Sequence, residues 1–182
     1  MNMPSPYDVI NPQHFTAGAL GEPGQRVFFL QCQGEGVLVT LRCEKQQVGA
    51  LGESFARILA DLPGRPLGPL PTEVDLVFPV EEAFVVGGIG LGYDSDHDRL
   101  LLLIEELVIS EDPDSVPEAI AARWVLTREQ VQAFVLRAHD LVAGGAAVVS
   151  TVRAGHRSGR PYLHQDQRAS SPLNASAMND TR

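Results

Sequence analysis

The sequence predicts an α+β domain built from a duplicated β-β-β-α unit, with antiparallel sheet pairing and two packed helices. Two segments, residues 15–62 and 84–142, each begin with a Phe-x-x-Gly strand, continue with two further strands and end in a helix. The length of 182 residues and the hydrophobic content of 44% fit one globular domain of this kind. Whether the two units pair edge to edge in one sheet or pack as two layers stays open.

The strands are indicated by apolar runs that end at turn residues. They are "FTAGALG", "RVFFLQCQ" and "GVLVTLRC" in the first unit, and "FVVGGIGLG", "RLLLLIEELVI" and "AARWVL" in the second. Between them, "GEPGQ" and "YDSDHD" carry the Gly, Pro, Asp and Ser residues that favour hairpins. We expect Trp124 in the core. Cys32 and Cys43 are expected as buried thiols on neighbouring strands, with a disulfide or redox pair as the alternative.

The helices are indicated by apolar residues at three- and four-residue spacing, which places them on one helix face. Thr127 and Gln130 predict a capping box at the start of the second helix. Gln47-Val48-x-Ala50-Leu51 in the first helix corresponds to Gln130-Val131-x-Ala133-Phe134 in the second. The apolar faces consist of Val48, Leu51, Phe55, Leu59 and Leu62 in the first helix, and Val131, Phe134, Ala138 and Leu141 in the second.

The expected organisation is a single pseudo-symmetric domain over residues 1–144, followed by a disordered tail over 145–182. The segment 63–71, "PGRPLGPLP", is a proline-rich surface linker between the units, because proline fits neither a helix interior nor a central strand. The formal net charge of −9 divides into −12 on residues 1–144 and +3 on the tail. An acidic body disfavours nucleic-acid binding. We also expect no membrane span and no secretory signal, and hence a cytoplasmic protein.

The candidate ligand-binding residues are Arg42, Glu44, Lys45 and Gln46, at a strand-to-helix junction where the helix start supplies positive potential. The alternative is that they are a polar first turn without a ligand. "DSDHD" (94–98) is interpreted as a solvated turn rather than a calcium loop, since the required Gly and Glu are missing. "GGIGLG" (87–92) is interpreted as a bulged strand rather than a phosphate loop. We find no catalytic motif and assign no metal.

The segments "VINPQHFTAGALGEPGQRVFFLQ", "LRCEKQQV", "FVVGGIGLGYDSDHDRLLLLIEEL" and "LTREQVQAFVLRAHDLVAGG" together resemble an actinobacterial family of unknown function, domain of unknown function 3090, over residues 8–144. The resemblance implies a C-terminal Cys/His segment of zinc-knuckle type in relatives, because two thiolates two residues apart with a later Cys and His can close a tetrahedral site. This chain has no cysteine after Cys43, so zinc is expected only in relatives.

The tail itself suggests what became of that segment. Read one base later, the codons for residues 157–164 can encode Asp-Pro-Glu-Gly-His-Ile-Cys, in the order that the family shows. Our hypothesis is that residues from about 145 onward are the family's C-terminus translated out of frame. A genuine, divergent disordered tail is the competing interpretation.

Two functions follow from these observations. The first is a non-enzymatic binding or regulatory module with an unknown protein or small-molecule partner, since no catalytic constellation is visible. The alternative is an enzyme that acts on a small metabolite, phosphorylated or not, at the helix start formed by Glu44, Lys45 and Gln46. A deep pocket beside Glu44 and Lys45 favours the enzyme, and a flat surface favours the module.

Overall fold

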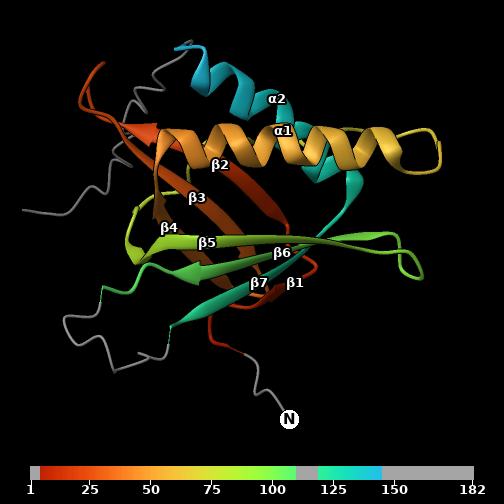
Figure 1. Ribbon diagram of the computed structural model, residues 1–182, viewed down its shortest axis with the longest axis horizontal. Coiled ribbons are helices and arrows are strands. Elements are labelled where there is room, and N and C mark those ends of the chain that lie inside the picture. The colour runs from red at the N-terminus through yellow and green to blue at the C-terminus, as the bar shows by residue number, and fades with distance from the viewer. Residues whose placement is uncertain (1–4, 110–118, 145–182) are drawn as a thin grey trace, which may run out of the picture. The chain divides into compact units, whose positions relative to one another are not determined.

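Seven strands form one mixed sheet, and two helices cover one of its faces (Figure 1). The computed structural model describes residues 5–109 and 119–144, so the acidic loop 110–118 and the tail 145–182 lie outside the described residues. The sheet order is β1-β7-β6-β5-β4-β3-β2. The strands are β1 (Val9–Ile10), β2 (His14–Leu20), β3 (Val27–Gly34), β4 (Val37–Cys43), β5 (Glu82–Asp94), β6 (Arg99–Glu106) and β7 (Ala121–Leu126). The helices are α1 (Lys45–Asp61) and α2 (Arg128–Val142), and neither is long and apolar enough to cross a bilayer.

The expected pairing of the strands is correct in part. The two β-β-β segments do join edge to edge, and the hairpins β2–β3 and β5–β6 form where the turn sequences predict them. A purely antiparallel sheet, however, is wrong, because β4 pairs with β5 and β1 pairs with β7 in parallel. The reason for the first parallel pair is the connection: α1 and the linker return the chain to the end of the sheet from which β4 started, which a hairpin cannot do.

Both predicted helices are confirmed. Val48, Leu51 and Phe55 of α1 are buried, as is the whole predicted apolar face of α2, which consists of Val131, Phe134, Ala138 and Leu141. The Thr127 side chain accepts a hydrogen bond from the Gln130 N–H, which confirms the capping box. The helices pack closely, since a Cβ atom added to Gly52 would lie 2.9 Å from the Cβ atom of Ala138.

An aromatic cluster fills the space between the sheet and the helices. Phe15 of β2 stacks on Phe134 of α2 with 4.7 Å between the ring centroids, and Phe55 of α1 meets both rings edge to face. Trp124 of β7 is fully buried beside Phe15, and its indole N–H donates to the Tyr7 carbonyl at 3.1 Å. The predicted core position of Trp124 is therefore confirmed. Such pairs add about 0.5–1.5 kcal/mol each beyond their area burial.

A short segment, Val74–Val77, crosses the other face of the sheet over β2 and β3, and we call it the strap. Because side chains alternate along a strand, Thr16 and Gln31 point away from the helices and toward it. The Gln31 amide donates to the Val77 carbonyl at 2.9 Å and accepts from the Val77 N–H at 2.7 Å, while the Thr16 hydroxyl donates to the Val74 carbonyl. The strap thus satisfies two polar side chains that are completely buried.

Candidate functional site

The predicted ligand-binding residues lie on the surface at the start of α1. Glu44 is the residue immediately before the helix, Lys45 and Gln46 are its first two residues, and Arg42 is near the end of β4. All four side chains are exposed. The structure therefore places them at a strand-to-helix junction, as the sequence indicates, but it does not gather all four around one cavity.

A shallow depression of about 380 Å³ opens beside Lys45, and we call it the α1 depression. Of the predicted residues only Lys45 lines it, so Arg42, Glu44 and Gln46 are not part of its wall. The remaining lining comes from the β2–β3 turn, the start of β3 and the end of α2. Within the part of the chain that the structure describes, the lining residues are Pro23, Gly24, Arg26, Phe28, Lys45 and Gly144.

Arg26 is the residue of this depression that the sequence reasoning missed. Its Nε atom is buried, and in the described part of the chain no acceptor lies within hydrogen-bond distance of it. By contrast Arg65, Arg123, Arg128 and Arg137 each have a carboxylate partner. Burying a guanidinium nitrogen without an acceptor costs about 1–3 kcal/mol of stability. The Nε atom of Arg26 is therefore an unsatisfied hydrogen-bond donor.

The strand register explains why Arg26 and Lys45 come together. In the antiparallel pair β3–β4, Phe28 lies opposite Cys43. Arg26 lies just before β3 and Lys45 just after β4, so both residues leave the same end of this strand pair and line the same depression. The signal that could have found Arg26 is therefore the register of the hairpin β3–β4, which depends on knowing where the turn after Gly34 falls.

Gln47 has a structural role. Its Oε1 atom accepts from the Glu44 N–H at 2.8 Å, and its Nε2 atom donates to the carbonyls of Val86 and Gly87 at 3.2 and 3.4 Å. These carbonyls lie where the pairing of β5 with β6 shifts by a residue, between Val86 and Gly88. The helix start and the glycine-rich strand are thus joined by one side chain, and the expected bulge in "GGIGLG" is confirmed.

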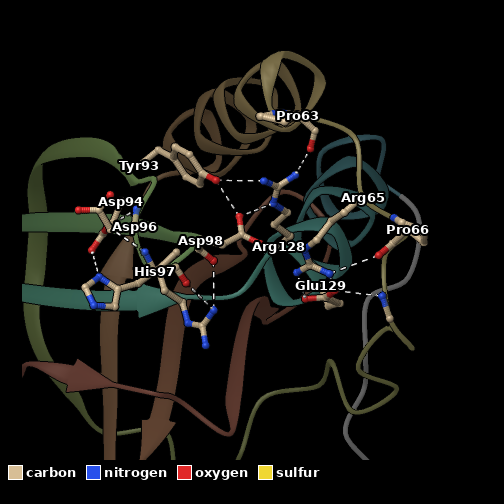
Figure 2. A network of polar contacts seen from close by, with 12 residues as sticks. Pro63, Arg65, Pro66, Tyr93, Asp94, Asp96, His97, Asp98, Arg128 and Glu129 are labelled. Atoms are coloured by element: carbon tan, nitrogen blue, oxygen red, sulfur yellow. Dashed lines mark hydrogen bonds and ion pairs between the residues drawn. The ribbon is translucent and has the colours of Figure 1, made fainter.

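A polar network lies at the other end of α1, around the start of α2 (Figure 2). Asp98 accepts from Arg128 Nε at 2.6 Å, from the Tyr93 hydroxyl at 2.7 Å and from Arg65 Nε at 2.8 Å. The hydrogen bond from Tyr93 and those from the two arginines hold the pKa of Asp98 well below its ordinary value. The predicted turn forms and the side chains of Asp96 and His97 are exposed, but the Asp98 carboxylate in the same turn is held by protein donors and not by solvent alone.

The same network anchors the linker to α2. Arg65 pairs with Glu129 through two hydrogen bonds, and the Gly68 N–H donates to Glu129 at 3.0 Å. Burial raises the pKa of Glu129, but the hydrogen bonds from Gly68 and Arg65 outweigh it and lower the pKa to about 2. Both carboxylate oxygens of Asp98 and of Glu129 accept hydrogen bonds from the protein, so this network joins the linker to α2.

Metal and thiol chemistry find little support in the residues that the structure describes. Within 5–109 and 119–144, no three His, Cys, Asp or Glu side chains come together as metal ligands. Cys32 and Cys43 are free and buried on neighbouring strands, and burial raises the pKa of Cys43 to about 12. Cys32 lies opposite Val39 rather than Cys43, so the register does not bring the two thiols face to face.

Comparisons with known proteins give a family and nothing more specific. No curated protein and no solved structure matches the chain significantly. The family model described as "Protein of unknown function (DUF3090)" matches residues 7–152, which is most of the chain and includes the whole of the described sheet and both helices. The chain belongs to this family of unknown function.

Proposed function

We propose that the protein is a non-enzymatic binding module and that the α1 depression takes a small anionic group, such as a phosphate or a carboxylate. The observation that carries this proposal is Arg26, whose buried Nε atom has no acceptor among the described residues and which lines the depression together with Lys45. An oxyanion bound there accepts from both cations. Among the described residues neither Arg26 nor Lys45 has a carboxylate partner, so the two cations in this depression are not neutralised by the protein.

The first turn of α1 supports the same ligand. Backbone N–H groups at a helix start have no acceptor within the helix, and the helix dipole adds positive potential there. Lys45 is the first residue of α1, so the ammonium group and the helix start act from the same side. The depression is shallow and open, and among the described residues no carboxylate or imidazole lines it. Such a wall can hold an anion but supplies no general base, which favours a binding module over the enzyme alternative.

Titration with inorganic phosphate tests the proposal. In amide NMR spectra of the full chain, we expect phosphate to shift the resonances of Gly24, Lys45 and Gly144. Removing one charged hydrogen bond costs about 1 kcal/mol, so Arg26→Gln and Lys45→Gln should each weaken binding about fivefold.

Arg42→Gln is the matched control, because Arg42 is an exposed arginine near the depression that does not line it. Equal weakening by Arg42→Gln would show that only the general field attracts phosphate, and the proposed site would then be wrong. Hydrolysis of p-nitrophenyl phosphate by the wild type that Lys45→Gln abolishes would overturn the non-enzymatic assignment.

The duplicated unit is also part of the proposal, and the two glutamines Gln47 and Gln130 support it. Each accepts a hydrogen bond from the N–H of the residue that precedes its helix, at 2.8 and 3.0 Å respectively. Each also donates to a backbone carbonyl distant in the chain, Gln47 to Val86 of β5 and Gln130 to Pro12, which lies two residues before β2. A reciprocal pair of this kind is what an ancestral duplication leaves behind.

For the segment from about residue 145 onward, we retain the proposal that it is an out-of-frame version of the family's C-terminus. Sequencing the gene across this region tests it. A reading frame displaced by one base should restore Cys-x-x-Cys and Asp-Pro-Glu-Gly-His-x-Cys, and a frame that restores neither leaves a divergent tail as the explanation.

A further inference from the structure

The second half of β5 has a free edge. From Glu82 to Val85, β5 is flanked by β4, which pairs with it in parallel. Beyond that point β4 has ended, and the segment Gly88–Asp94 pairs with β6 alone. Among the residues that the structure describes, no strand occupies the line along which β4 would continue. The backbone N–H and C=O groups on this side of β5 are therefore without a strand partner.

This edge lacks the usual protection against pairing. Natural proteins cover a free edge or place lysine, proline or an inward-pointing charge on it. Gly88–Asp94 contains three glycines and no charge before Asp94, and none of its seven residues is buried. A half-buried strand edge without a strand partner and without a charge before Asp94 is a template for an added strand.

A groove runs beside the edge, between β5 and α1. Its volume is about 290 Å³, and its lining residues come from α1 and β5. The ribbons of these two elements can be followed in Figure 1. The α1 wall consists of Gln47, Ala50, Leu51 and Ser54, and the β5 wall of Gly87, Ile89 and Leu91. Strand and helix walls of this kind receive alternate side chains of an extended peptide, while the strand edge pairs with the peptide backbone.

The charge at the end of the edge indicates what kind of peptide fits. Beyond Asp94 the chain enters its turn, where the Asp96 side chain is exposed and has no cation partner in the described part of the chain. The body as a whole carries a net charge of −12. Both the local and the overall charge favour a cationic partner over a neutral or an acidic one.

We propose that the free edge of β5 binds an extended segment of another protein, which adds to the sheet as a strand along the continuation of β4. The segment has small or β-branched apolar side chains at alternate positions, which enter the groove beside Ala50 and Leu91, and a basic residue that meets Asp96. This site is separate from the α1 depression and does not depend on anion binding there.

A fluorescent probe peptide, acetyl-Arg-Val-Thr-Val-Thr-Val-Arg-amide, tests the site in the full chain by fluorescence anisotropy. Ala50 is exposed on the groove wall, so Ala50→Trp fills the groove without entering the core. We expect Ala50→Trp to weaken probe binding by at least about tenfold, which corresponds to about 1.4 kcal/mol. Ala60→Trp places the same ring at an exposed position of α1 outside the groove and should leave binding within about twofold of the wild type.

Two N-methylated probes test the strand addition itself. In an added strand, only every second N–H of the peptide faces the sheet. Methylation of one alternating set should therefore abolish binding, and methylation of the other set should preserve it. Equal effects of the two probes, no binding of the parent probe, or equal weakening by Ala50→Trp and Ala60→Trp would each overturn the proposal.

Size-exclusion chromatography with light scattering addresses the rival occupant, a second copy of this chain. A wild-type dimer that Ala50→Trp converts to a monomer means that the edge pairs with itself, and the peptide proposal is then wrong. Lys45→Gln separates the two proposals, because it should weaken phosphate binding and leave probe binding unchanged.

Discussion

β2 and the second half of β5 each have one edge without a strand partner, but the residues of the two strands differ in burial. Every residue of β2 except Leu20 is buried, whereas no residue of Gly88–Asp94 is. The edge of β2 is covered by α2, whose Arg137 donates to the Ala17 carbonyl at 3.3 Å, and the strap covers its outer face. Beside β5, α1 forms only the far wall of a groove.

The difference shows that a strand's place in the element order does not determine its protection. Both strands lead a three-stranded segment that ends in a helix. What protects β2 is the chain that follows α1, because that chain supplies the strap and the salt bridge between Asp75 and Arg137. Burial of a strand edge thus depends on tertiary contacts. In this sheet those contacts bury the β2 edge and leave the edge of Gly88–Asp94 accessible.

The largest expected effect on stability comes from removing the hydrogen bonds that join the strap to β3. Gln31→Leu removes both hydrogen bonds between the Gln31 side chain and Val77, so the backbone N–H and C=O of Val77 lose this partner. We expect the free energy of unfolding to fall by about 3 kcal/mol, measured by urea denaturation. Leu103→Gln, at a position 45% exposed on the outer face of β6, should change it by less than about 0.5 kcal/mol. Similar losses in both variants would mean that the two sides are equally protected.

The second effect compares the two helix starts. Gln130→Leu and Gln47→Leu each remove one hydrogen bond to a distant backbone carbonyl, that of Pro12 or Val86, and one from the residue before the helix. Gln130 is buried and Gln47 is half-buried, so we expect losses of about 2 and 1 kcal/mol in urea denaturation. A loss confined to one of the two variants would contradict their equivalence.

The third effect is a matched pair of glycine substitutions. A Cβ atom at Gly18 would overlap the Leu76 side chain of the strap, whereas at Gly90 the nearest heavy atom is the Leu103 Cβ at 3.6 Å. Gly18→Ala should therefore destabilise the protein by about 1 kcal/mol, and Gly90→Ala should be neutral or stabilise it by about 0.5 kcal/mol. Thermal unfolding of the two variants under identical conditions measures the contrast.

The smallest effect is that of pH on the linker that leads to the strap. Because the pKa of Glu129 in the folded protein is about 2, below its ordinary value of 4.5, its contribution is full at pH 7 and is lost as the pH falls toward 2. We expect Glu129→Gln to be less stable than the wild type by about 1 kcal/mol at pH 7 and by much less near pH 2.5. A difference that is the same at both pH values would show that the charge of Glu129 does not hold the linker.

Features that depend on neighbouring residues could be predicted from the sequence. The helices follow from the spacing of residues such as Val48 and Phe55, and the capping box from Thr127 and Gln130, because helix contacts lie within four positions. Features that join distant segments could not. The parallel pairing of β4 with β5 and the position of the strap depend on where a long connection returns, and no local pattern encodes that.

The candidate site shows the same division. Lys45 could be predicted because a strand-to-helix junction is visible in the sequence, while Arg26 could not, because it reaches Lys45 only through the β3–β4 register. The ion pairs of Asp98 could not be predicted for a related reason. Its partners Arg65 and Arg128 are 33 and 30 residues away in the chain, and no local pattern indicates either one.

The path of the linker decides how this protein can be divided. After α1, Arg65 of the linker pairs with Glu129 of α2, and the strap that follows contacts Arg137 of α2 through Asp75 and Gln31 of β3 through Val77. The segment that crosses β2 and β3 is therefore held in position by two residues of α2, Glu129 and Arg137. A split reporter divided in this proline-rich stretch would separate the strap from the first unit, although the strap packs on β2 and β3 of that unit. We expect the two fragments to fold only when they are expressed together.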